Sequence, residues 1–135
     1  MDGLSLFILR ITSNPIDVKT LKLAEGDSVY EHLAVTFENR FPKKNWGWVA
    51  GATQVEDLKK LRVKSPDRWL LIPGVGAQGG AVAEALEGAR SPDGEVRGIL
   101  NASRSILYAS SGGDFKVEAR RAALELVAEM RLVGS

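Results

Sequence analysis

A glycine-rich stretch at residues 73–80 has the composition of a phosphate-binding turn. It reads Pro-Gly-Val-Gly-Ala-Gln-Gly-Gly, and it lies between an apolar run and a segment with helical spacing. Glycines let the backbone turn sharply and come close to a ligand, and the free amides at a helix start favour an anion. The stretch therefore predicts an anion site, with a tight turn that binds nothing as the alternative.

Residues 74–79 also match the dinucleotide pattern G-x-G-x-x-G. That fingerprint further requires an acidic residue about twenty positions on, at the end of the next strand. The acidic candidates Asp93 and Glu95 come before the next apolar run and not after it. A dinucleotide-binding fragment is therefore the weaker hypothesis.

A second polar stretch, Asn-Ala-Ser-Arg at residues 101–104, follows that next apolar run. An arginine at the end of a neighbouring strand can place a bidentate guanidinium on the phosphate that a glycine turn holds. Arg104 and the glycine stretch would then share one anion. The alternative is that Arg104 is a surface charge in a loop.

Four apolar runs, each followed by a helical pattern, must position these residues. We expect strands at residues 6–11, 46–50, 69–72 and 96–101. We expect one helix to begin after a capping box formed by Ser28 and Glu31, and a second helix to begin at Val55. Two more helices are expected at residues 81–89 and 115–132. The runs at 6–11 and 69–72 do not alternate with polar residues, which is typical of buried strands.

Four βα units in series predict a parallel sheet, either open or part of a (β/α)8 barrel, with function at the carboxyl ends of the strands. The core is expected to include Tyr30, Trp46, Trp48 and Trp69, and the closing helix should turn residues 119, 122, 123, 126, 127 and 130 inward.

Composition excludes several classes of site. The chain has 135 residues, 44% hydrophobic and 26% charged, with a formal net charge of +1, so no global field attracts nucleic acid or a membrane. It has no cysteine and a single histidine, His32, which we expect to be a surface or packing residue of a helix. We therefore expect no metal site, no nucleic-acid partner and no membrane partner. The N-terminus does not resemble a signal peptide, which predicts a cytoplasmic protein.

The runs at residues 71–80 and 101–109, together with 12–15 and 51–53, resemble the orotidine 5'-phosphate decarboxylases, in particular the longer bacterial subgroup. The resemblance extends over residues 1–135 as one domain. It implies an α/β fold of four consecutive βα units, the C-terminal half of a TIM (β/α)8 barrel. The family converts orotidine 5'-phosphate to UMP and CO2 in pyrimidine biosynthesis, without metal or cofactor.

The resemblance also implies roles for seven residues. Gln78 and Arg104 would hold the phosphate with backbone amides near Gly79, Gly80 and Ser103. Ser13 would hydrogen-bond the pyrimidine, and Pro73 would line the pocket beside the base. Together the expected substrate-binding residues are Ser13, Pro73, Gln78, Gly79, Gly80, Ser103 and Arg104.

The family's catalytic motif, D-x-K-x-x-D, does not occur in this sequence. Asp17 and Lys19 match the first half of this motif, but Lys22 stands where the second aspartate should be. Asp57 and Lys59 also have the first spacing, but they belong to a helical segment. We expect solvated charges at both places. No catalytic residue is therefore assigned, and the isolated chain is expected to be inactive. A half-barrel that binds phosphorylated ligands or assembles with itself, without chemistry, is the alternative.

The length supports half a barrel, because a complete (β/α)8 barrel needs about 250 residues. A starting methionine with no strand before Leu6 indicates a boundary between the fourth and fifth units. Such a half exposes two strand edges and an apolar interior, which favours a homo-oligomer or pairing with a missing N-terminal half.

Overall fold

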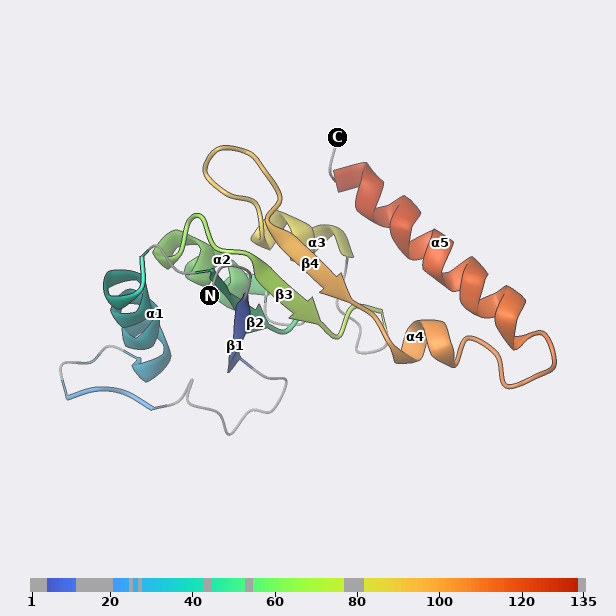
Figure 1. The fold of residues 1–135 in the computed structure, drawn as a ribbon, viewed down its shortest axis with the longest axis horizontal. Coiled ribbons are helices and arrows are strands. Elements are labelled where there is room, and N and C mark those ends of the chain that lie inside the picture. The colour runs from blue at the N-terminus through green and yellow to red at the C-terminus, as the bar shows by residue number, and fades with distance from the viewer. Residues whose placement is uncertain are drawn as a thin grey trace.

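A computed structural model of the chain describes residues 5–11, 21–24, 26, 28–42, 45–52, 55–76 and 82–133. The elements, in chain order, are β1 (Leu6–Ile11), α1 (Val29–Arg40), β2 (Trp46–Ala50), α2 (Val55–Lys64), β3 (Leu70–Pro73), α3 (Val82–Gly88), β4 (Gly98–Asn101), α4 (Arg104–Leu107) and α5 (Phe115–Val133). The four strands form one sheet in the order β1-β2-β3-β4, and every neighbouring pair is parallel. The predicted series of βα units is confirmed (Figure 1).

The start of α1 shows the serine half of the predicted capping box, whereas the Glu31 carboxylate accepts from the Ser28 hydroxyl and, within the described residues, not from a backbone amide. The Ser28 hydroxyl accepts a hydrogen bond from the amide of Glu31 at 3.4 Å and donates one to the Glu31 carboxylate at 2.6 Å. An N-cap of this kind satisfies a backbone donor that has no partner inside the helix. One turn further, His32 is exposed, as expected.

One face of the sheet carries the core, packed beneath α1, α2 and α3. Trp48, Leu70 and Ile72 are fully buried there against residues of α2. The rings of Trp46 and Trp48 meet edge to face, with centroids 5.0 Å apart, a geometry that aromatic pairs favour. The indole N–H of Trp48 donates to the buried Ser65 hydroxyl at 3.0 Å. Trp46 and Trp48 are thus core residues, as predicted.

The opposite face of the sheet is not covered by any part of the chain that the structure describes. Alternate side chains along a strand point to opposite faces, and on this face Phe7, Leu9, Trp69 and Ile99 are 39%, 64%, 49% and 42% exposed. The predictions that Trp69 is a core residue and that β1 is a buried strand were therefore wrong. Both faces of these strands carry apolar side chains, as in a sheet that is covered on both faces, but the described residues cover only one face.

A single arginine joins the loops at the amino ends of β3 and β4. The guanidinium of Arg62 is buried and donates to five backbone carbonyls, at 2.7 to 3.2 Å, which belong to Ser65, Pro66, Arg68, Ala89 and Arg97. Burial, and secondarily the charge of Arg97, lowers the pKa of Arg62 to about 10. Five carbonyls from two loops thus accept hydrogen bonds from one side chain.

Two further charged groups on α2 differ in exposure. Asp57 was predicted to be solvated, but it is only 4% exposed and accepts a hydrogen bond from the Tyr30 hydroxyl at 3.5 Å. That prediction was wrong because Asp57 lies on the side of α2 that faces α1. Lys59 is exposed and pairs with Glu56 at 3.0 Å, as expected of a solvated charge.

The last helix, α5, packs against α3 and α4. Of the residues predicted to face inward, Ala119, Ala122, Ala123, Leu126 and Met130 are partly buried, whereas Val127 is 40% exposed and was wrongly placed. None of the helices in the described ranges is long and apolar enough to cross a membrane.

Candidate functional site

The carboxyl ends of β3 and β4 lie side by side. Pro73 and Asn101 are partners in the parallel register and are the last residues of their strands. Both therefore lie at the same edge of the sheet, where parallel α/β folds place their ligands. Pro73 also contacts the segment just after β2, since its carbonyl accepts a hydrogen bond from the amide of Ala52 at 2.9 Å.

The turn after β3 depends on glycine. Gly74 and Gly76 have φ angles of 88° and 80°, in the left-handed region that glycine enters without steric cost. A Cβ atom on Gly76 would lie 3.3 Å from the hydroxyl oxygen of Ser105, at the start of α4. The glycine turn and the segment after β4 are therefore in direct proximity, as the sequence predicted for two adjacent strand ends.

The segment after β4 is ordered by a short helix. The Ser103 carbonyl accepts from the amides of Ile106 and Leu107 at 3.1 and 2.8 Å, which starts α4 at Arg104. The Ser103 hydroxyl does not cap this helix and instead donates to the Asn101 side-chain oxygen at 3.2 Å. This contact ties Ser103 to the strand end beside Pro73.

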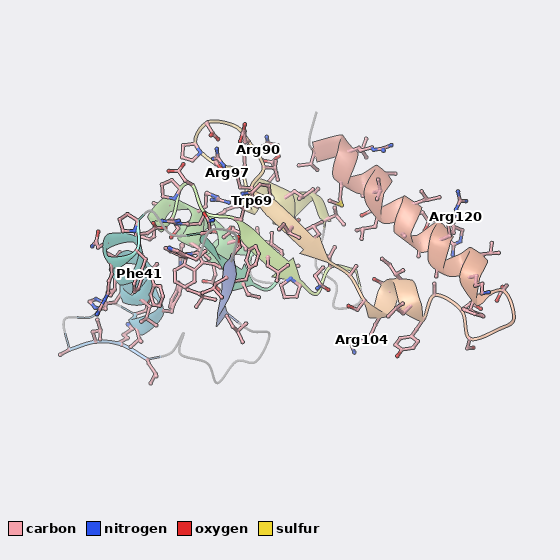
Figure 2. All side chains as sticks on the ribbon, viewed as in Figure 1. Phe41, Trp69, Arg90, Arg97, Arg104 and Arg120 are labelled. Atoms are coloured by element: carbon pink, nitrogen blue, oxygen red, sulfur yellow. The ribbon has the colours of Figure 1, made fainter. Side chains whose placement is uncertain are left out.

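Arg104 is exposed at the first position of α4. Its side chain extends away from α5, at the end of the molecule toward which β3 and β4 point (Figure 2). Within the described residues no carboxylate pairs with Arg104, whereas Arg90 and Arg97 form ion pairs with Glu87 and Asp93 at 2.7 and 2.6 Å. The Arg104 guanidinium thus keeps its donors available at the edge where the two strands end.

Three of the seven predicted site residues can be located. Pro73, Ser103 and Arg104 come together at the ends of β3 and β4. The other four, Ser13, Gln78, Gly79 and Gly80, lie outside the described residues.

Two residues at this edge were not assigned a role from the sequence, Asn101 and Ser105. Asn101 faces the same side of the sheet as its partner Pro73 and orients Ser103. Its position at a strand end was the available signal. Ser105 gave no such signal, because its contact with Gly76 depends on how α4 folds.

Hollows also lie elsewhere in the described chain, two of them beside the sheet and α5. One of about 560 Å³ is lined by Phe7, Gly47 and Trp69 at the amino ends of the strands, and it is the unfilled end of the uncovered sheet face. Another of about 260 Å³ lies between Gly76 and α5, where Glu125 and Glu129 make an anion unfavourable. Within the described chain, neither hollow offers an arginine without a carboxylate partner, as the edge beside Arg104 does.

Comparison with known proteins identifies relatives. The chain is 44% identical, over 128 residues, to the orotidine 5'-phosphate decarboxylase of Dehalococcoides mccartyi strain CBDB1, which covers 90% of this chain and 46% of that protein. The chain is related to the orotidine 5'-phosphate decarboxylases. The decarboxylase of Polaromonas naphthalenivorans is 41% identical over 133 residues, with 90% of this chain and 45% of that protein covered. The chain thus spans about half the length of the decarboxylases it matches. No family model matches it.

Solved structures give the same relationship. An OMP decarboxylase of Leishmania donovani superposes with a TM-score of 0.70 and 26% identity, over 94% of this chain and 48% of that one. A UMP synthase of Leishmania donovani gives a TM-score of 0.72 and 30% identity, over 93% and 28% of the two chains. With the four-stranded parallel sheet, these superpositions identify the fold as half of a (β/α)8 barrel.

Proposed function

We propose that this chain is the C-terminal half of an orotidine 5'-phosphate decarboxylase and carries the phosphate-binding part of its active site. The observation that carries the proposal is the contact of Gly76 with Ser105, which holds the glycine turn next to Arg104. The decarboxylases that match 90% of the chain support the reaction class.

In this proposal Arg104 binds the phosphate through charge-assisted hydrogen bonds, which are among the strongest that side chains make. Backbone amides near Ser103, Gly79 and Gly80 and the side chain of Gln78 complete the phosphate site. On the side of the base, Ser13 hydrogen-bonds the pyrimidine ring.

The remaining contact with the base comes from Pro73, which lines the pocket. The register supports this role, because Pro73 ends β3 on the uncovered face of the sheet, next to Asn101.

The chemistry itself requires groups that this chain lacks. Loss of CO2 from orotidine 5'-phosphate leaves negative charge at C6 of the pyrimidine, which must be stabilised and then protonated. The sequence contains no D-x-K-x-x-D motif to do this. Phosphate contacts alone bind substrate and product alike, so they lower the barrier only when the other half supplies the lysine and carboxylates.

A second candidate is a half-barrel that binds phosphorylated ligands, or assembles with itself, without chemistry. The absence of the catalytic motif from this chain favours it. A partner polypeptide that supplies a D-x-K-x-x-D motif and restores turnover would decide for the decarboxylase.

Calorimetric titration with UMP, uridine and inorganic phosphate tests the proposed function. We expect UMP to bind at least about tenfold more tightly than uridine, because charge-assisted hydrogen bonds are worth about 1.5–3 kcal/mol and 1.4 kcal/mol is tenfold. Inorganic phosphate should compete with UMP. Equal affinity for UMP and uridine, or no binding of either compound, would overturn the phosphate assignment.

A further inference from the structure

The face of the sheet that no described residue covers is apolar up to its carboxyl end. Alternation along the strands turns to this face Phe7, Leu9, Val49, Leu71 and Ile99. Asn101 ends β4 two positions after Ile99, so it faces the same way, and it is exposed. Among the strand residues whose side chains the structure describes, Asn101 is the one polar side chain on this face.

The carboxamide of Asn101 has only its oxygen engaged. Its Oδ1 atom accepts a hydrogen bond from the Ser103 hydroxyl at 3.2 Å. The nitrogen, Nδ2, carries two N–H donors on the other branch of the planar group. No hydrogen bond from Nδ2 occurs among the described residues. The two donors are therefore turned away from Ser103 and are available to another partner.

These donors require an acceptor when the face is covered. An amide group that leaves water without a hydrogen bond is unfavourable, and buried polar groups nearly always have a partner. The side chains next to Asn101 on this face, Ile99 and Pro73, are apolar and offer no acceptor. A ligand bound where β3 and β4 end, beside α4, can supply one (Figure 1).

The position of Asn101 along this edge selects the part of the ligand. In the proposed function, Arg104 holds the phosphate and Pro73 lies beside the base. Asn101 is the register partner of Pro73, so it lies on the side of the base. Because Oδ1 is already engaged, the group that complements Asn101 is a hydrogen-bond acceptor. Uracil has such acceptors in its two carbonyl oxygens.

We propose that Nδ2 of Asn101 donates a hydrogen bond to a carbonyl oxygen of the pyrimidine base. This inference rests on the proposed function, and it adds a polar base contact from β4 to the apolar contact that Pro73 makes from β3. The Ser103 hydroxyl orients the carboxamide, because it holds Oδ1 and leaves the nitrogen for the ligand.

Calorimetric titration of Asn101→Leu with UMP and with ribose 5-phosphate tests this contact. Leucine has nearly the shape of asparagine but no donor. We expect UMP to bind about two- to tenfold more weakly, the range for one neutral hydrogen bond. The affinity for ribose 5-phosphate should not change, because this ligand has no base. Asn45→Leu is the matched control, since Asn45 is exposed at the amino end of β2, and it should bind both ligands as the parent does.

The two ligands separate this inference from the proposed function. Arg104→Ala should weaken both ligands, whereas Asn101→Leu should weaken only UMP. Equal UMP affinity for Asn101→Leu and the parent would overturn the inference and leave the phosphate site in place. An equal loss for both ligands would also overturn it, because Asn101 would then act on the ribose phosphate or through Ser103. A parent chain that binds neither ligand would overturn the inference and the proposed function together.

Asn101→Ala is the second variant if circular dichroism shows that leucine disturbs the fold, and it carries the same expectation. The 2-thio and 4-thio analogues of UMP then identify the oxygen, since sulfur accepts hydrogen bonds more weakly than oxygen. In a double-mutant cycle, the loss caused by the Asn101 substitution should be smaller for one analogue than for UMP. A loss as large for both analogues as for UMP would overturn the inference.

Discussion

Gly76 lies against Ser105, so closely that a Cβ atom on Gly76 would stand 3.3 Å from the serine hydroxyl. The φ of Gly76 is +80°. This contact joins the turn after β3 to the first turn of α4, and Arg104 is the residue before Ser105. The left-handed conformation of Gly76 therefore lets the glycine turn lie close to the residue that follows Arg104.

Gly76→Ala is expected to lower the free energy of unfolding by about 1–2 kcal/mol, because an L-residue in the left-handed region carries that strain. It should also weaken UMP binding by displacing α4. Urea denaturation and calorimetry measure the two effects. Gly113→Ala is the control, since nothing lies within 4 Å of a Cβ there and its φ is not positive. Identical stability and affinity for the two variants would contradict this view of the turn.

Arg62→Lys is expected to destabilise the chain by about 1–3 kcal/mol, because an ammonium with three donors cannot reach five carbonyls, and that of Pro66 accepts no other hydrogen bond among the described residues. Urea denaturation measures the loss. Arg40→Lys changes an exposed arginine at the end of α1 and should have little effect. If Arg62→Lys unfolded at the same urea concentration as the parent, the hydrogen bonds from Arg62 to the carbonyls would contribute nothing to the free energy of unfolding.

The ion pair of Asp93 with Arg97 predicts a dependence of stability on pH. The hydrogen bond from Arg97 lowers the pKa of Asp93 below its ordinary value of 3.8. The stabilisation is therefore present above pH 3.8 and is lost as the pH falls through the lowered pKa. Asp93→Asn should be less stable than the parent at neutral pH, and the two should converge as the pH falls below the lowered pKa of Asp93.

Thermal denaturation across this pH range measures the difference. Glu84→Gln is the control, since Glu84 is an exposed carboxylate of α3 for which no ion pair occurs among the described residues. A constant difference between Asp93→Asn and the parent at all pH values would show that the carboxylate charge is not the cause.

The isolated chain is expected to show no decarboxylase activity, because the proton donor and carboxylate array are absent from its sequence. Release of CO2 from carboxyl-labelled orotidine 5'-phosphate measures this, with protein from a host that lacks its own decarboxylase. Turnover by the purified chain alone would contradict the division of roles between the two halves.

Much of the fold could be predicted from the sequence because hydrophobic pattern determines which segments become strands and helices. The bounds of β2, Trp46–Ala50, were predicted as observed. The third strand was expected at residues 69–72 and is Leu70–Pro73, because strand ends depend on pairing with neighbours rather than on composition. The expected exposure of an apolar interior agrees with the uncovered face of the sheet, but the apolar pattern did not show that Trp69 lies on that face.

The site was predictable to the extent that it follows from topology. Adjacent parallel strands end at the same edge, which brought Arg104 and the glycine turn together. The helix α4 was missed because four residues are too few to show a helical period. The role of Arg62 was missed for a different reason, since its carbonyl partners come from loops up to 35 residues away.

The central claim is that Arg104 holds a phosphate at the ends of β3 and β4, and UMP titration of Arg104→Ala tests it most directly. The account predicts affinity at least about tenfold weaker than that of the parent, because a charge-assisted contact is lost. Arg40→Ala, which removes an exposed arginine from α1, and His32→Ala should bind UMP as the parent does. Equal UMP affinity for Arg104→Ala and the parent would contradict the account.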